Sequence, residues 1–386
     1  MAPSIWNLII GLVTFLSNSR PTLSMLDLGN SASCYKPPQI CPNSNITYHL
    51  FNRNIKNRNG YELKIDDPNS LDRAPFTRFK PVIFISHGYT GHLHMSPNPE
   101  LIDAYRRIQK DEPYNLIALD WGRLCPAPCY TQSAHNVALV GNCTAQFIEV
   151  LLQHQTWFVL KDIHFVGFSL GAQVAGQVAR RLTIGKLEWI TALDPAFPLF
   201  DTLTTGDEER LDTNDANFLE VYHTNAGYKG QPKAIGHVDF FANHLFTQPG
   251  CGTDSSCNHR RAVLYYAESI YSKTGFYAYQ CLSVITHLIG FCSPSDSDDY
   301  VLIGHRINHT KAAVVKKTSA SQKSTLGEKS GKKFGENDKA AFYWKKIPKQ
   351  EEERQIGQDN IFINKCRSKI KRIPKFCCCK QFMNNL

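Results

Sequence analysis

Long apolar runs are scarce in this chain of 386 residues. The apolar stretch near its start, residues 5–16, is about a dozen residues long, whereas a membrane-spanning helix needs about 20. It leads into Ser17-Asn18-Ser19, a small-x-small pattern suited to signal peptidase, although no Lys or Arg precedes it. We therefore expect a signal peptide over residues 1–19 and no membrane helix after it.

Two further absences narrow the class of protein. Paired CxxC spacings are missing, which argues against zinc as the purpose of the 13 cysteines. The chain also has neither an internal repeat nor a motif that reads nucleic acid. Cysteines in such numbers are typical of oxidising compartments, and sequons at Asn45, Asn142 and Asn308 agree with secretion. The sequence predicts a secreted, extracellular glycoprotein with no nucleic-acid partner.

Cysteine spacing predicts part of the disulfide pattern. Two close spacings indicate bridges that each close a short loop, Cys251 with Cys257 and Cys281 with Cys292. Four earlier cysteines have open partners, with Cys34 or Cys41 reaching Cys125 or Cys129. Because the total is odd, at least one thiol is free or bridges to another chain.

Charge divides the chain into a body and a tail. Residues 301–386 hold 20 Lys and Arg against 7 Asp and Glu, so the remainder of the chain is mildly acidic. Periodicity fades near Ser293, and residues 311–339 are rich in Lys, Ser, Thr and Gly without a core pattern, which predicts disorder. We expect one domain over residues 20–300 and a basic, largely disordered tail over 301–386.

Short apolar runs within the body predict its fold. They have the pattern of strands buried on both faces, and they cover residues 82–85, 116–119, 163–166, 189–193 and 218–222. Helix-like stretches separate them, notably residues 134–153, where apolar side chains recur at helical spacing. Strands that alternate with helices indicate the α/β fold class with a mostly parallel central sheet.

One serine stands at the apex of a strand-turn-helix pattern. Gly167-Phe168-Ser169-Leu170-Gly171 follows the run at 163–166 and precedes small residues at 172–179, as in a nucleophile elbow. Residues beside the serine in such a turn must be nearly without side chains, and Gly167 and Gly171 satisfy that requirement. A serine hydroxyl is a poor nucleophile unless an imidazole takes its proton and an acid orients the imidazole. The pattern therefore predicts Ser169 as a nucleophile with two partners elsewhere.

The acid is expected beyond the serine, at the end of a strand. Asp194 ends the run at 189–193, and the following Pro195 favours an extended backbone there. The alternative for Asp194 is an Asx turn before the proline. Asp120 also ends a run, but it precedes the serine and breaks the expected order.

Chain order alone leaves seven candidates for the base: His223, His237, His244, His259, His287, His305 and His309. Most histidines in such a set are surface groups or hydrogen-bonded core groups. His259 is favoured because the adjacent Cys251–Cys257 loop would anchor its position.

A series of ordered motifs between Cys41 and Cys292 resembles a known family. They are His87-Gly88-Tyr89, Leu119-Asp120-Trp121, the elbow extended to Ala172-Gln173, Leu193-Asp194-Pro195-Ala196, Arg210-Leu211-Asp212 with Asp215-Ala216, Gly236-His237-Val238-Asp239-Phe240, and Cys257-Asn258-His259-Arg260-Arg261-Ala262. The chain resembles the animal lipases, a family that includes pancreatic lipase, lipoprotein lipase and venom phospholipases A1. The resemblance implies an α/β-hydrolase fold with Ser169 as nucleophile, Asp194 as acid and His259 as base.

The resemblance also implies supporting groups. The backbone N–H groups of Tyr89 and Leu170 would form the oxyanion hole. Arg210, Asp212 and Asp215, with Asp207 less certain, match a calcium-binding segment of several members, and a solvated acidic loop is the other interpretation. No cofactor is required, and calcium, where bound, would be structural.

Two short loops bear on the substrate. The cysteine-bounded segment before the base, Gly252-Thr253-Asp254-Ser255-Ser256, has no hydrophobic residue, so it cannot form the amphipathic flap of triacylglycerol lipases. The loop at 224–235 is also short, and it carries lysines and glycines. In the family, truncation of both loops goes with phospholipase A1 activity, with an sn-1 fatty acid as product. Triacylglycerol or galactolipid hydrolysis is the alternative, and a non-catalytic lipid-binding or storage protein is the alternative of another class.

The end of the chain departs from the family pattern. Residues 301–386 are too basic and too poor in alternating pattern to predict the C-terminal β-sandwich of pancreatic-type lipases. Basic residues near an anionic membrane contribute about 1 kcal/mol each to binding. The expected partners are therefore a lipid-ester substrate at an interface and, through the tail, an anionic membrane surface or sulfated glycans.

Overall fold

The computed structural model describes residues 34–201, 206, 209–243, 245–280 and 300–309, and the backbone of 341–344. By its internal contacts the chain divides into two units, residues 1–345 and 346–386. All described residues belong to the first unit. The predicted signal peptide and the Cys281–Cys292 bridge lie outside the described residues.

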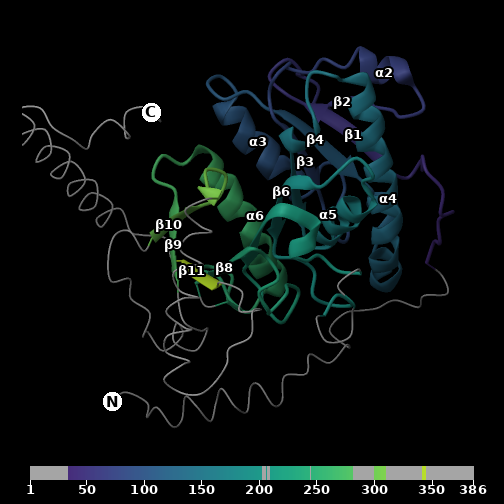
Figure 1. Cartoon of the computed structure of the whole chain (residues 1–386). Coiled ribbons are helices and arrows are strands. Elements are labelled where there is room, and N and C mark those ends of the chain that lie inside the picture. Colours follow the sequence, from purple (N-terminus) through teal and green to yellow (C-terminus); the bar gives the residue numbers. More distant parts are fainter. Residues whose placement is uncertain are drawn as a thin grey trace, which may run out of the picture. The chain divides into compact units, whose positions relative to one another are not determined.

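One sheet of 11 strands organises the described residues (Figure 1). Its spatial order is β10-β9-β11-β8-β7-β6-β5-β3-β4-β1-β2. The strands are β1 Thr47–Phe51, β2 Tyr61–Leu63, β3 Val82–Ser86, β4 Asn115–Asp120, β5 Ile163–Phe168, β6 Leu187–Leu193, β7 Ala216–His223, β8 Val238–Ala242, β9 Phe276–Gln280, β10 Tyr300–Ile303 and β11 Ala341–Trp344. The seven strands from β11 to β4 pair in parallel, whereas β1, β2, β9 and β10 are antiparallel to their neighbours.

The parallel strands confirm the predicted α/β class. All five apolar runs lie inside strands β3 to β7, and nearly every side chain of these strands is buried. Crossovers connect β3, β4, β5 and β6 through helices, as parallel pairing requires. This mostly parallel sheet with its crossover helices is the α/β-hydrolase fold.

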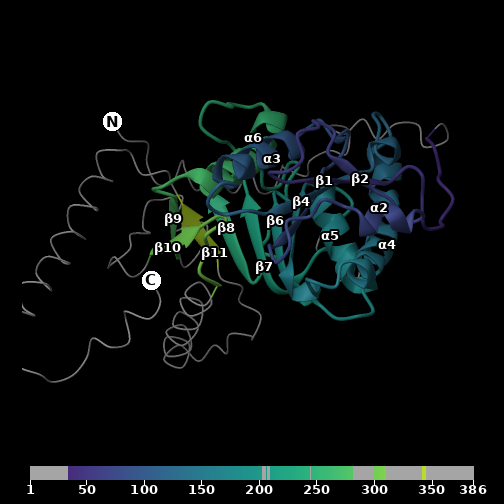
Figure 2. The same ribbon diagram turned by 90° about the horizontal axis from the view of Figure 1, so that it is seen from above.

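Helices cover both faces of the sheet (Figure 2). They are α2 Pro68–Asp72, α3 Asn98–Ile108, α4 Tyr130–His154, α5 Leu170–Arg181 and α6 Ser255–Tyr271. One hydrophobic cluster joins α4 and α5 to one face, and another joins α3 and α6 to the opposite face. The predicted helix at 134–153 is the greater part of α4, whose buried side chains include Val137, Phe147 and Leu151.

The sheet extends past the predicted domain boundary at residue 300. β10 begins at that boundary and pairs with β9, and β11 inserts between β9 and β8. Because β11 lies at 341–344, the folded part of the chain continues into the predicted tail. Disorder in the rest of the tail falls on residues outside the described set and stays a prediction.

Three disulfides tie the described residues together: Cys34–Cys129, Cys41–Cys143 and Cys251–Cys257. The third confirms the prediction from spacing. The first confirms the expectation that Cys34 or Cys41 reaches Cys125 or Cys129; Cys41 pairs instead with Cys143 on α4, a partner that was not predicted, and Cys125 is a buried free thiol. Sequence separation could not reveal this, because the folded sheet brings together cysteines 102 positions apart.

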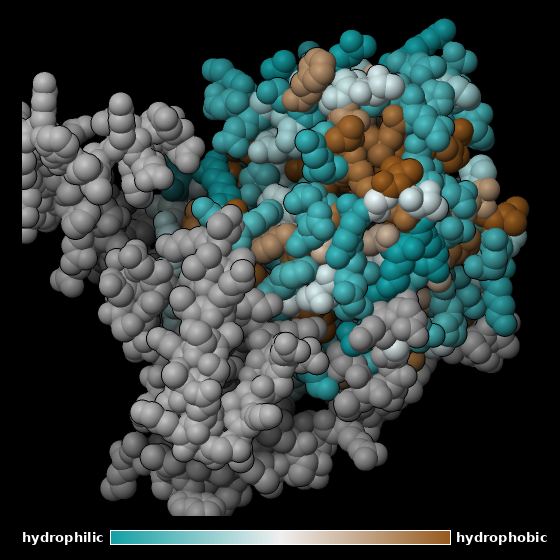
Figure 3. Space-filling view, viewed as in Figure 1, coloured by the Kyte–Doolittle hydropathy of each residue, from teal (hydrophilic) through white to brown (hydrophobic). Residues whose placement is uncertain are grey.

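The surface seen in Figure 3 is mostly hydrophilic, with its largest group of apolar residues in the upper part of the view and smaller apolar spots elsewhere. Among the described helices, none combines the length and apolarity needed to cross a bilayer.

Candidate active site

Ser169 occupies the turn between β5 and α5 in a strained conformation. Its φ is +57° and its ψ is −121°, a combination that a non-glycine residue rarely adopts. The backbone is held from both sides, because the Ser169 N–H donates to the Leu193 carbonyl and the Ala196 N–H donates to the Ser169 carbonyl, each at 3.1 Å. Strain of this kind persists only where surrounding structure enforces it, and here the end of β6 does so.

Two glycines make the turn possible. A Cβ on Gly167 would lie 2.4 Å from the Gly171 carbonyl oxygen, and a Cβ on Gly171 would lie 2.2 Å from the Ser86 carbonyl oxygen. A methyl group fits at neither position, because the atoms it would meet belong to the backbone and cannot move aside as a flexible side chain could. The strand, the sharp turn and the helix predicted around Ser169 are all present.

Asp194 and His259 meet although 65 positions separate them. His259 Nδ1 donates to Asp194 Oδ2 at 2.6 Å, and both residues are buried. The other carboxylate oxygen, Oδ1, accepts from the N–H groups of Thr224 at 2.8 Å and Asn225 at 3.2 Å. Because the N–H at Nδ1 is used in this hydrogen bond to Asp194, the neutral imidazole has Nε2 free of a proton, as a proton acceptor.

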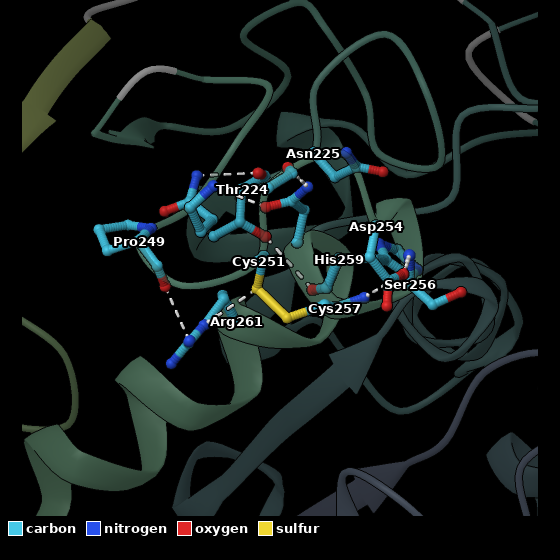
Figure 4. Close-up of a disulfide and its surroundings, with 12 residues drawn as sticks. Thr224, Asn225, Pro249, Cys251, Asp254, Ser256, Cys257, His259 and Arg261 are labelled. Atoms are coloured by element: carbon cyan, nitrogen blue, oxygen red, sulfur yellow. Dashed lines mark hydrogen bonds between the residues drawn. A yellow bond between two sulfur atoms is a disulfide. The ribbon is translucent and has the colours of Figure 1, made fainter.

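His259 stands on the first turn and a half of α6, two residues after Cys257 of the disulfide (Figure 4). Asp254 caps this helix, accepting from the N–H groups of Ser256 at 2.9 Å and Cys257 at 3.0 Å. The ring of Phe168, the residue before Ser169, lies 4.6 Å from the His259 ring, centroid to centroid. The Cys251–Cys257 bridge therefore fixes the helix start that carries the histidine, as the spacing suggested.

The loop after β3 lies directly against Ser169. A Cβ on Gly88 would lie 2.7 Å from the Ser169 Cβ and 3.2 Å from its Oγ. His87 fixes the loop, because its Nδ1 donates to the Gly88 carbonyl at 3.0 Å and its Nε2 accepts from the Trp121 N–H at 3.1 Å. This contact brings the predicted oxyanion-hole segment next to the serine.

Tyr89 and Leu170, the predicted oxyanion donors, lie in this neighbourhood. Leu170 is the first residue of α5, where backbone N–H groups are not used by the helix itself. The Tyr89 ring packs edge-on against Tyr130 at 5.1 Å, and Tyr130 Oη donates to the Pro198 carbonyl. The Cys125 thiol lies below this loop, donating to the Gly88 carbonyl at 3.6 Å, and burial raises its pKa to about 12.

The remaining candidate residues have other partners. Burial opposes ionisation of Asp120, but the His87 ring, 3.4 Å away, and a hydrogen bond from the Gly122 N–H lower its pKa well below the usual value. His237 Nδ1 accepts from the Leu219 N–H, and His305 bonds to tyrosine hydroxyls. His244 and His287 lie outside the described residues.

A second buried His–Asp pair was missed by sequence reasoning. His223 Nε2 lies 2.9 Å from Asp239 Oδ1, and His223 Nδ1 donates to the Gln231 carbonyl at 2.8 Å. Asp239 also accepts from the N–H groups of Ile235 and Gly236. The pair therefore fixes both ends of the loop whose N–H groups hold Asp194. Asp239 interrupts an apolar run, and that buried charge is the signal that could have been followed.

Comparison with known proteins agrees with this geometry. The sequence profile of the lipase family matches residues 29–334. The chain belongs to the lipase family. It is 34% identical to pancreatic lipase-related protein 2 of Cavia porcellus over 258 residues, which are 65% of this chain and 57% of that protein. It is 33% identical to pancreatic triacylglycerol lipase of Sus scrofa over 275 residues, 65% of this chain and 59% of that protein.

The family also includes proteins named inactive. Inactive pancreatic lipase-related protein 1 of Homo sapiens is 33% identical over 276 residues, 65% of this chain and 57% of that protein. This lipase-family chain spans less than two thirds of the length of these relatives. Family membership alone therefore does not decide whether this chain is an enzyme. The arrangement of Ser169, Asp194 and His259 bears on that question directly.

In this family member, the two short loops beside the site are linked to each other. Lys229 Nζ donates to Ser256 Oγ at 2.7 Å, and Ser255 Oγ donates to Asn225 Oδ1 at 2.6 Å. Burial lowers the pKa of Lys229, and the nearby Asp254 opposes that shift. The loops at 224–235 and 252–256 therefore form one cross-linked polar rim beside the Asp194–His259 pair.

The predicted calcium residues contact each other and an arginine. Arg180 Nη2 lies 2.8 Å from Asp215 Oδ2 and 3.6 Å from Asp212 Oδ2, and Asp212 Oδ1 accepts from the Asn214 N–H. Arg210 is buried beside them, and burial raises the pKa of Asp215 to about 7 despite Arg180. Because a guanidinium already faces both carboxylates, this arrangement does not fit a cation held by the two together. Asp207 lies outside the described residues, and calcium binding stays an untested prediction.

Proposed function

We propose that this chain is a serine hydrolase that cleaves carboxylic esters of lipids. The observation that carries the proposal is the 2.6 Å bond from His259 Nδ1 to a buried Asp194 that also accepts two backbone N–H groups. These contacts leave His259 Nε2 as the base. They also fix the Asp194 carboxylate, whose negative charge stabilises the imidazolium that forms. Ser169, strained in a nucleophile elbow and preceded by Phe168, whose ring packs on that histidine, supplies the nucleophile.

The reaction would proceed in two halves. His259 Nε2 takes the proton of Ser169 Oγ while that oxygen attacks the ester carbonyl carbon. The imidazolium then gives this proton to the departing alcohol oxygen, which leaves an acyl-serine. Water then attacks the acyl carbon while His259 takes its proton; the imidazolium returns this proton to Ser169 Oγ as the acyl–serine bond breaks, and the fatty acid is released.

The oxyanion of each tetrahedral intermediate needs donors that are already in place. The N–H groups of Tyr89 and Leu170 have that role in the proposal, with His87 and Gly88 shaping the segment. One such donor contributes about 3–4 kcal/mol to the transition state. The N-terminus of α5 adds a favourable dipole for the developing charge.

Among lipid esters, we propose glycerophospholipids cleaved at sn-1. Support comes from the rim, where the segment between Cys251 and Cys257 begins a helix capped by Asp254 and leaves no length for a flap. A polar rim that carries Lys229 can accommodate a charged headgroup better than a hydrophobic flap can. The relatives named triacylglycerol lipases favour the alternative substrate, and the relative named inactive favours a non-catalytic lipid-binding protein.

A mixed-chain substrate tests activity and bond together. We expect wild-type protein to release the sn-1 acid from a diacyl phospholipid with different chains at its two positions. Ser169→Ala should lose about 10⁴-fold or more in kcat with unchanged folding, because only a hydroxyl is removed. A phosphonate should label Ser169. Undiminished turnover by Ser169→Ala would contradict catalysis at this serine, and preference for triacylglycerol emulsions would contradict the phospholipid assignment.

We also propose an extracellular location. Three disulfides are typical of proteins that fold in an oxidising compartment. Two of them close loops spanning 95 and 102 positions, and bridges of that length stabilise a fold by about 4–5 kcal/mol in chain-entropy terms. Of the three sequons, Asn308 is exposed, whereas Asn45 and Asn142 are half-buried.

A further inference from the structure

A cavity lies at the amino-terminal ends of the central strands, whereas Ser169 lies at their carboxyl ends. Its volume is about 630 Å³, within the range of small-molecule sites. It is lined by Ile163, the first residue of β5, whereas Ser169 follows the last residue of the same strand. At the rise of a parallel strand, that separation is roughly 20 Å. A molecule in this cavity would therefore be distinct from a substrate at the catalytic serine.

Aromatic rings form much of the cavity wall. Phe79, Trp157, Phe158 and Trp189 line it, and Trp157 packs against Phe158 at 4.6 Å between centroids. Trp189 stacks on the His164 ring at 3.7 Å. These flat, hydrophobic surfaces suit an apolar chain rather than a hydrated solute.

Phe79 has two unfavourable features, and its ring has an edge-on contact with Trp157 at 6.3 Å between centroids. Its φ is +59°, in the left-handed region, and the residue is 78% exposed. An exposed aromatic ring gains little from burial, and a left-handed backbone costs about 1–2 kcal/mol for a residue with a side chain. Such a combination points to a contact with something outside the described protein.

The charged side chains that line the cavity differ in their partners: the carboxylates accept hydrogen bonds, whereas two lysines form no ion pair among the described residues. Asp162 accepts from the Val159 N–H, Glu188 accepts from Asn217 Nδ2, and Glu112 accepts from Tyr114 Oη and Arg306. Lys80 and Lys161 also line the cavity, are exposed, and have no ion-pair partner within the described part of the chain. The rim therefore offers two ammonium groups to an anion.

Two histidines that line the cavity, His164 and His305, are neutral near pH 7. Burial lowers the pKa of His305 to about 4, with Arg306 adding to the effect, and it lowers the pKa of His164 well below its usual value. These imidazoles therefore add no positive charge to that of the two lysines.

We propose that this cavity binds a long-chain fatty acid, with its carboxylate between Lys80 and Lys161 and its chain along Trp157, Phe79 and Trp189. An aromatic wall with cations at the rim is complementary to an amphiphilic carboxylate. The proposal concerns binding alone and does not depend on catalysis at Ser169.

Tryptophan fluorescence of the full-length chain tests it. Trp157 and Trp189 line the cavity, so a fatty acid brominated along its chain should quench them on binding. The alcohol of the same length, identically brominated, should bind about tenfold more weakly. The double substitution Lys80→Gln and Lys161→Gln should weaken binding of the acid by a similar factor, since exposed ion pairs contribute up to about 1 kcal/mol each.

Phe79→Gly separates binding from stability. Glycine adopts a positive φ without strain, so this variant should melt no lower than wild type while binding the acid more weakly. Leu199→Gly is the matched control, because Leu199 also has a positive φ, of +66°, and does not line the cavity. Its binding should equal that of wild type.

Two results would overturn the proposal. One is equal quenching in wild type and in the Lys80, Lys161 and Phe79 variants. The other is loss of quenching after phosphonate labels Ser169, which would place the acid at the catalytic serine instead. Because neither measurement uses turnover, failure of this proposal leaves the proposed hydrolase untouched, and an inactive protein could still bind the acid.

Discussion

At the scale of single residues, Gly230 packs so closely on the proposed acid, Asp194, that no side chain fits at its position. A Cβ at this position would lie 2.3 Å from Asp194 Oδ1 and 2.5 Å from its carboxyl carbon. Gly230→Ala should therefore displace the carboxylate or the loop and lower kcat about 10²-fold, as misplacements near 1 Å do. Gly252→Ala is the control for backbone strain without a clash, because its φ is +54° and nothing lies within 4 Å of its added methyl group. Equal kcat values for the two variants would show that Asp194 does not need this packing.

The same scale shows what the sequence could and could not predict. Ser169 and Asp194 were predicted from their position after strands, because an elbow and a strand end are local patterns. His259 was one of seven histidines until the family resemblance selected it. The His223–Asp239 pair was not predicted, since its two members stand 16 positions apart on neighbouring strands and only the register of β7 and β8 brings them together.

At the scale of elements, the polar rim predicts how the enzyme responds to a lipid surface. Phospholipid hydrolysis should rise smoothly with substrate, without the abrupt increase that flap opening produces at an interface. Replacing residues 252–256 by a long amphipathic segment should lower phospholipid turnover relative to triacylglycerol turnover. The substitution of the same five residues by another short polar sequence is the control. A graft that leaves the ratio unchanged would contradict the role of the rim.

Strand prediction succeeded where burial is complete and failed elsewhere. The five predicted strands lie in the central parallel part of the sheet, where both faces are covered and the sequence is continuously apolar. β8 is equally buried, but Asp239 interrupts its apolar run. β1 is antiparallel and half-exposed on alternate residues, so its pattern is weaker.

At the scale of the whole molecule, a buried acid predicts a pH dependence of stability. Burial raises the pKa of Glu220 from 4.5 to about 8, although hydrogen bonds from Thr191 and Tyr222 oppose the shift. The folded state then holds this proton more tightly than the unfolded state, so its stabilising effect is complete below pH 4.5 and is lost as pH rises toward 8.

Comparison with Glu220→Gln isolates this contribution. Between pH 5 and 8, the free energy of unfolding of wild type should fall relative to that of the variant by up to about 1.4 kcal/mol per pH unit. Urea unfolding at several pH values measures both curves. Parallel curves would mean that Glu220 titrates alike in the folded and unfolded states.

Truncation of the basic tail tests whether it binds anionic surfaces. A cut after Ser293 would remove β10 and β11, so the cut belongs after Lys345, where the first compact unit ends. We expect the truncated chain to keep turnover of a soluble short-chain ester but to bind anionic vesicles or heparin more weakly, with a smaller dependence on salt. Equal binding by both forms at low and moderate salt would leave the tail without this role.

The loop after β7 has a consequence for redesign of specificity. Its first two residues, Thr224 and Asn225, give their N–H groups to Asp194, and Gly230 packs on the same carboxylate. The stretch between them, Gly227-Tyr228-Lys229, faces the rim, with Tyr228 exposed and Lys229 bonded to Ser256. Headgroup preference and catalytic geometry are thus encoded a few positions apart in one segment. Gly227 has a φ of +76° that favours glycine, so only Tyr228 and Lys229 can be randomised in a search for new substrates without disturbing the acid that orients the base.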